Sequence, residues 1–175
     1  GGDAVSRDKI RQQTELFSTI CRVSNQYQAI GEKYYNSISL KQEYLLWVME
    51  DYFKSEPPTL NDLAGKIGSS HQNVKQMVVK LVEKGYLTLE YDAEDRRKRR
   101  VCFTDKYRMD KEIFSKRRQV FIEQVFDGIT DQEVDNSINI IEKMMNNLSV
   151  LLYNKEHTCK MFADHNCNKI LDLDK

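Results

Sequence analysis

Two stretches of this sequence carry side chains suited to reading a nucleic acid. Residues 70–76 hold hydroxyl, imidazole, amide and ammonium groups. The amides can donate and accept together, as adenine requires, while Lys75 suits guanine or a phosphate. Residues 96–100 form an unbroken run of Arg and Lys. Such a run is more often a solvated loop than a binding site, so its meaning depends on the elements that position it.

The charge of the chain is unevenly distributed. The sequence has 175 residues, with 27 Lys and Arg against 27 Asp and Glu, and its net charge is zero. By segment, residues 1–64 carry −2, residues 65–118 carry +7 and residues 119–175 carry −5. The positive charge therefore surrounds both polar stretches, which favours a nucleic acid as the partner of the middle third.

Composition predicts a folded chain with long helices. Hydrophobic residues make up 40% of the sequence, which is enough for a core, and only 7 Gly and 2 Pro interrupt it. No apolar run approaches the roughly 18–20 residues that cross a bilayer, and no leader-like segment opens the chain. We therefore expect a cytoplasmic protein without a membrane partner. The initial Gly1-Gly2 is set aside as a remnant of cloning.

Apolar spacing and capping residues predict the elements. Helices are expected over 7–30, ending near Gly31; from Ser39 to Pro57-Pro58; and over 59–67, 71–84, 104–127 and 130–152. After Gly85 the apolar period falls from about 3.6 to 2, which predicts a hairpin of residues 87–91 and 101–103 with its tip at 92–99. Two short helices around a Gly-containing turn, followed by a hairpin, indicate a winged helix-turn-helix.

The long terminal helices have more apolar surface than so small a winged module can cover. The stripe on the last helix consists of Val134, Ile138, Ile141, Met145, Leu148 and Leu152. We therefore expect a second copy of the chain to pack on these helices, which makes a homodimer. The alternative is a three-helix bundle within one chain.

Two motifs resemble the MarR (multiple antibiotic resistance regulator) family: Leu81-Val82-Glu83-Lys84-Gly85-Tyr86-Leu87, and Asp92-Ala93-Glu94-Asp95-Arg96-Arg97 before Thr104. The resemblance covers about residues 8–150. It implies a mainly α fold whose winged helix-turn-helix domain spans 8–152, with the helix-turn-helix at about 59–84, the wing at about 87–104, dimerisation helices at 7–31 and 104–152, and a C-terminal extension at 153–175. It also implies a homodimeric transcription regulator, here expected to be a repressor, that binds pseudo-palindromic DNA.

The resemblance places the first turn of the 71–84 helix in the major groove and the wing tip in the minor groove. Asp95 would hold Arg97, the groove-inserting residue, and Arg100 would begin the return strand facing solvent. The alternative is that Ser69 or Ser70 only caps the helix and that the amides are solvated. The predicted DNA-binding residues are Ser70, His71, Gln72, Asn73, Lys75, Gln76, Asp95, Arg96, Arg97, Lys98 and Arg99, with Lys80 and Lys84 as weaker phosphate candidates.

Regulation by a small molecule or by oxidation is a further implication of the resemblance. By position, the effector pocket would involve Tyr27, Tyr44, Trp47 and Tyr107, although aromatic residues at such spacing are often plain core. Peroxide-sensing relatives use a cysteine about one turn before Cys21, so Cys21 is expected to be a buried, inert thiol. Cys102 is expected to point away from its apolar neighbours in the strand.

The C-terminal extension repeats a His-x-Cys pattern. Zinc prefers these ligand types, but the spacing is not a common zinc motif, and a frayed helical extension is the alternative. We therefore predict no cofactor. The metal ligands would otherwise be His157, Cys159, His165 and Cys167.

Enzyme motifs are absent from the sequence. It has no glycine-rich phosphate loop, no HExxH and no Gly-x-Ser-x-Gly, so we do not predict an enzyme. The expected partners are double-stranded DNA, a second copy of the chain and a small-molecule effector. Two alternatives remain open: a thiol- or zinc-responsive regulator of the same fold, and a winged-helix interaction module that does not read DNA.

Overall fold

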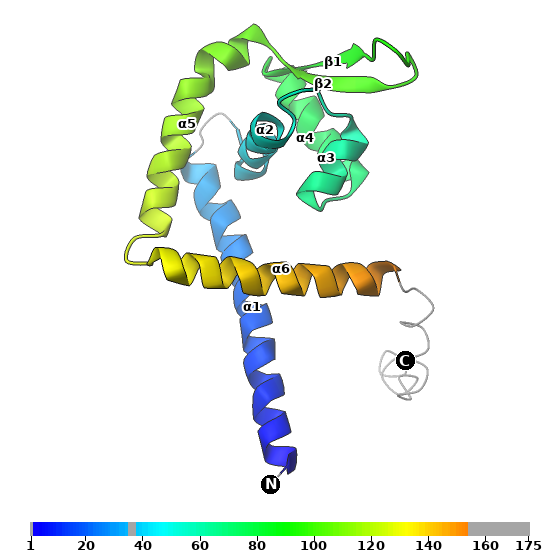
Figure 1. Cartoon of the computed structure of the whole chain (residues 1–175). Coiled ribbons are helices and arrows are strands. Elements are labelled where there is room, and N and C mark those ends of the chain that lie inside the picture. Colours follow the sequence, from blue (N-terminus) through cyan, green and yellow to red (C-terminus); the bar gives the residue numbers. More distant parts are fainter. Residues whose placement is uncertain (1, 35–37, 154–175) are drawn as a thin grey trace, which may run out of the picture. The chain divides into compact units, whose positions relative to one another are not determined.

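The computed structural model describes residues 2–34 and 38–153 (Figure 1). These residues form α1 (Gly2–Tyr34), α2 (Leu40–Tyr52), α3 (Leu60–Ile67), α4 (His71–Glu83), β1 (Leu87–Tyr91), β2 (Arg99–Phe103), α5 (Asp105–Val125) and α6 (Asp131–Tyr153). The two strands make one antiparallel hairpin. The predicted fold class, mainly α with a winged helix-turn-helix, is confirmed. The chain divides into two compact units, residues 1–125 and 126–175.

Side-chain caps begin the helices where the sequence predicts them. The Ser39 hydroxyl accepts from Gln42 N at 3.2 Å, and the Gln42 side chain accepts from Ser39 N at 3.0 Å. Thr59 caps α3 in the same reciprocal way, and Thr130 caps α6. Each cap satisfies backbone N–H groups that the helix itself leaves unpaired, which contributes about 1 kcal/mol.

The first helix does not end near Gly31, and this prediction is wrong. The helix continues to Tyr34, and Gly31 lies buried inside it. A Cβ at Gly31 would stand 2.5 Å from Leu40 Cβ. The absence of a side chain at Gly31 therefore allows α1 to pack closely against the start of α2, and the glycine does not end the helix.

The core of the first unit gathers apolar side chains from α2, α3, α4, the hairpin and α5. At its centre the Tyr107 ring stacks on Phe103, with ring centroids 4.3 Å apart, and on Phe114 at 5.7 Å. Full burial of such a side chain contributes about 1.5–3 kcal/mol. The fully buried apolar residues include Leu45, Leu46, Val48, Leu63, Val74, Val78, Leu81 and Val101.

The hairpin is anchored at its base to the helices. Val101 N donates to Pro58 O at 2.8 Å, and Thr104 Oγ1 donates to Gly85 O at 2.6 Å. Gly85 has a φ of +77°, a left-handed conformation that glycine adopts readily, and it turns the chain from α4 into β1. A two-stranded hairpin is barely stable alone, so these contacts hold the wing on the helix-turn-helix.

Helix α6 is amphipathic, and much of its apolar side is exposed in the single chain. Of the predicted stripe, Ile138, Ile141, Met145 and Leu148 are all between 42% and 60% exposed, and the Leu152 side chain lies outside the described residues. Several apolar residues of α1, among them Ile10 and Phe17, are exposed as well. In the described part of the chain, no helix has the length and apolar character needed to cross a membrane.

Candidate nucleic-acid interface

The first turn of α4 presents polar side chains to solvent while its other face is buried. Ser70 is the N-cap, and its hydroxyl accepts from Asn73 N at 3.2 Å. This bond occupies one acceptor position and leaves the hydroxyl proton available. The predicted base-reading residues His71, Gln72, Asn73, Lys75 and Gln76 are all exposed, and Val74, Val78 and Leu81 bury the opposite face.

The wing tip is an ordered turn built around Asp92. Asp92 Oδ1 accepts from Glu94 N at 2.9 Å and from Asp95 N at 2.8 Å. Lys98 N donates to Asp95 O at 2.8 Å, which closes the turn. The hydrogen bonds from Asp95 N, Arg100 and Glu94 N hold the pKa of Asp92 at about 2. The side chains of residues 96–99 are thus presented from a fixed backbone.

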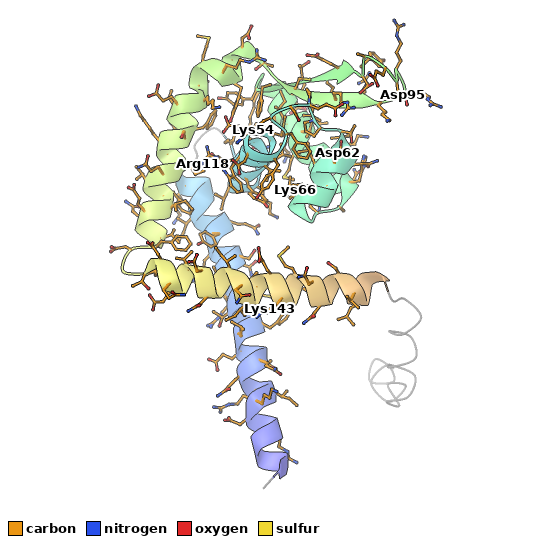
Figure 2. All side chains as sticks on the ribbon, in the orientation of Figure 1. Lys54, Asp62, Lys66, Asp95, Arg118 and Lys143 are labelled. Atoms are coloured by element: carbon orange, nitrogen blue, oxygen red, sulfur yellow. The ribbon has the colours of Figure 1, made fainter. Side chains whose placement is uncertain are left out.

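Asp95 holds Arg97, as the wing motif predicts. Arg97 Nε donates to Asp95 Oδ1 at 3.0 Å, and Arg97 Nη2 donates to Oδ2 at 3.4 Å. The Arg97 side chain is nonetheless 92% exposed, and Figure 2 shows Asp95 at the end of the hairpin. The guanidinium lowers the pKa of Asp95, so the pair stays charged. Arg97 is therefore oriented and still free to enter a groove.

Arg100 does not face solvent, which corrects the prediction from sequence. Its side chain is 19% exposed and lies between Asp92 Oδ2, 2.5 Å from Nε, and Glu56 Oε1, 2.6 Å from Nη2. Nη1 also donates to Pro57 O at 3.0 Å. The hairpin register pairs Arg100 with Glu90, and the Arg100 side chain extends to the loop between α2 and α3. Arg100 therefore fastens the wing to the helices.

Arg99 has a partner that the sequence analysis missed. Tyr91 lies directly opposite Arg99 in the hairpin register, and Arg99 Nη2 donates to the Tyr91 hydroxyl at 3.2 Å. The Arg99 guanidinium carbon also lies 4.9 Å from the centre of the Tyr91 ring. Counting back through the hairpin pairs from Phe103 would have placed these two residues together.

The other predicted cations differ in their surroundings. Arg96, Lys98 and Lys80 are exposed. Lys84 closes α4, where its Nζ lies 3.5 Å from Gln42 Oε1 of α2. Lys84 thus contacts the body of the molecule in addition to lying near the end of the proposed recognition helix.

The four aromatic residues predicted for an effector pocket lie in three places. Tyr44 and Trp47 both belong to α2, and their rings stack on each other with centroids 5.8 Å apart. Tyr27 of α1 contacts Phe121, and Tyr107 lies in the core. None of the four lines the cavity of about 330 Å³ behind the wing. That cavity is bounded by the end of α2, the following loop and both strands, with Cys102 among its lining residues.

The two cysteines of the described residues differ in their surroundings. Cys21 is exposed, so the prediction that α1 buries it is wrong for the single chain. Cys102 is half-buried, and burial together with Glu90 raises the pKa of its thiol. The predicted zinc ligands His157, Cys159, His165 and Cys167 lie outside the described residues.

Comparison with solved structures identifies the fold. No protein-family model and no curated protein matches the sequence. A MarR/EmrR family transcriptional regulator from Acinetobacter sp. ADP1 is 17% identical, with a TM-score of 0.69 over 78% of this chain and 96% of its own. MepR from S. aureus, solved with DNA, is 16% identical, with a TM-score of 0.65 over 74% and 94%. BpsR from Bordetella bronchiseptica is 19% identical, with a TM-score of 0.64 over 73% and 91%. The chain therefore has the fold of MarR-type regulators.

Proposed function

We propose that this protein is a sequence-specific DNA-binding transcription regulator that acts as a homodimer. The observation that carries the proposal is the joint presentation of an exposed polar first turn on α4 and an ordered, cation-rich wing in which Asp95 orients Arg97. A helix N-terminus with amides suits base edges in the major groove, and an extended arginine suits a narrow minor groove. MepR, which shares this fold, was solved as a complex with DNA, and this agrees with the proposed role.

In the proposed dimer, each copy presents its own α4 and wing to one half of the operator. The exposed apolar stripes of α6 and α1 support a contact between two copies, since each copy would cover the other's apolar surface. A two-fold dimer binds a pseudo-palindrome whose half-sites lie about one helical turn apart. Occupying such a site beside a promoter blocks polymerase, so we propose a repressor that works in the cytoplasm.

A small-molecule effector would be the signal that releases DNA. The DNA binding of BpsR is regulated by 6-hydroxynicotinic acid, so a fold of this type can carry such a response. In this chain the stacked pair Tyr44 and Trp47, on the outward side of α2, offers aromatic surface for a planar ligand. A ligand acts by favouring dimers whose recognition helices are wrongly spaced.

Selection of genomic fragments on the immobilised protein, at stated salt, tests the proposal. We expect enrichment of a palindromic site, and affinity that falls with salt at a slope of about −0.9 for each phosphate contact. Arg97→Ala should weaken binding by about 1–3 kcal/mol, whereas Arg117→Ala, which removes the same charge from the exposed side of α5, should leave it nearly unchanged. Failure to enrich any palindrome over bulk DNA would overturn the proposal and favour an interaction module instead.

A further inference from the structure

Three charged side chains meet between α2 and α5, away from the candidate nucleic-acid interface. Glu43 and Glu50 come from α2, and Arg118, labelled in Figure 2, comes from α5. The side chain of Glu43 is only 5% exposed, that of Glu50 is 14% exposed and that of Arg118 is 21% exposed. Charged groups are rarely so buried without close partners, so their pairing matters.

The pairing in this cluster is incomplete. Arg118 Nε lies 3.7 Å from Glu43 Oε1, and Nη2 lies 3.6 Å from Glu50 Oε2, so both contacts exceed hydrogen-bond distance. Arg118 Nη1 is buried with no hydrogen-bond partner among the described residues. Glu50 has a second cationic partner, because Lys111 Nζ forms an ion pair with Glu50 Oε1 at 2.8 Å. Glu43 is therefore the carboxylate whose charge is least compensated.

The surroundings of Glu43 make its charge sensitive to pH near neutrality. Burial raises its pKa, Arg118 lowers it and Glu50 raises it, and the net result of these three effects is a pKa of about 7. Helices α1, α3 and α4 also pack against α2, and within the described chain none of their ionisable groups is among the causes of this shift. A raised pKa means that the folded chain holds the proton more tightly than the unfolded chain, whose glutamate titrates near 4.5. The stabilising effect of the neutral form is therefore lost as the pH rises through about 7.

The same cluster connects to the wing through Tyr107. Tyr107 lies on α5, where burial and the charges of Glu50 and Glu43 raise the pKa of its hydroxyl, and its ring stacks on Phe103, the last residue of β2. Helix α5 itself begins two residues after β2 ends. A shift of α5 against α2 would therefore move the ring on which the base of the wing rests.

We propose that Glu43 is a proton-sensitive group that keeps α5 packed on α2 while neutral and loosens this contact when ionised, so that DNA affinity falls as the pH rises. An ionised Glu43 must either draw Arg118 away from Glu50 or admit water, and both changes disturb the packing beneath Tyr107. The effect on DNA rests on the proposed function, whereas the change at the helix interface does not.

Trp47 provides a readout of the interface that needs no DNA. It is the only Trp in the sequence and lies one turn from Glu43 on α2. We expect the wild-type fluorescence to titrate with a midpoint near 7, the value to which the Glu43 pKa is raised. Glu43→Gln, which keeps the shape without the charge, should lose this transition, and Glu43→Met should lose it too. The control Glu112→Gln, on the exposed side of α5, should retain it.

DNA affinity, measured at about pH 6 and about pH 8 and at one ionic strength, tests the coupling. We expect the ratio of the two affinities to be about fivefold larger for the wild type than for Glu43→Gln, at the low end of known couplings. Equal fluorescence titrations in both chains would overturn the switch. Equal affinity ratios, after a positive fluorescence result, would overturn its link to DNA. If neither chain retained DNA at either pH, the proposed function would fail together with that link, and the fluorescence result alone would decide the switch at the interface.

Discussion

Asp95 contacts Arg97 twice, through the guanidinium and through the backbone, because Oδ1 also accepts from Arg97 N at 3.1 Å. The carboxylate therefore fixes both the direction of the side chain and the turn that carries it. A free arginine would lose up to about 2 kcal/mol of rotamer entropy when it entered a groove, and the pair lowers that cost in advance.

Removing Asp95 should weaken DNA binding even though it makes the wing more positive. We expect Asp95→Ala to reduce affinity by about threefold to tenfold, because the lost orientation costs about 1 kcal/mol. Asp105→Ala is a matched control, since Asp105 forms an exposed pair with Arg108 at the start of α5. Titration of a fluorescent operator with each variant measures both affinities. Tighter binding by Asp95→Ala would show that charge, and not orientation, dominates.

Acid should release the wing through Asp92. Its folded pKa is lowered to about 2, so its stabilising effect is present above the ordinary value of 3.8 and is lost as the pH falls through about 2. Asp92→Asn should therefore lower the thermal midpoint at neutral pH and flatten its decline below pH 3.8. Thermal unfolding followed by circular dichroism across this range measures both effects. Parallel acid declines in the two chains would show that Asp92 is not responsible.

Two glycine substitutions should change stability in opposite directions. Gly31→Ala places a Cβ 2.5 Å from Leu40 Cβ, and we expect it to destabilise the protein by about 1–3 kcal/mol. Gly65→Ala, inside α3, meets nothing within 4 Å and should stabilise the protein by about 0.5–1 kcal/mol. Urea unfolding of both variants measures the two changes. A neutral Gly31→Ala would mean that α1 can move away from α2 at little cost.

A charge on the exposed apolar stripe of α6 should disrupt the proposed dimer. Met145→Glu introduces a carboxylate that would be buried without a partner between two copies, and we expect a loss of at least about 2 kcal/mol in association. Asn147→Glu, at an exposed polar position of the same helix, serves as the control. Sedimentation equilibrium measures the association constant. An unchanged constant for Met145→Glu would exclude this stripe from the interface.

Local signals in the sequence predict most of the helices and the hairpin, and they also predict part of the candidate nucleic-acid interface. The helix caps at Ser39, Thr59 and Thr130 involve residues three positions apart, so the sequence alone predicts a cap at each position. The change of apolar period after Gly85 predicts the hairpin, and the resemblance of the wing motif implies the Asp95–Arg97 contact. The partners in these contacts are close in sequence, so a short segment is enough to predict them, although the hairpin also needs its anchoring to the helices to be stable.

Tertiary structure alone decided the roles that depend on residues distant in sequence. Gly31 lies inside α1 because Leu40 packs against it, and Arg100 is enclosed because Glu56 and Asp92 surround it, whereas the sequence indicates a helix terminus and a solvated side chain. The burial of Glu43 beside Arg118 likewise joins positions 75 residues apart. A periodic pattern shows which face of a helix is apolar, but only the folded chain shows which charge is enclosed there, because desolvation depends on every element packed around the group.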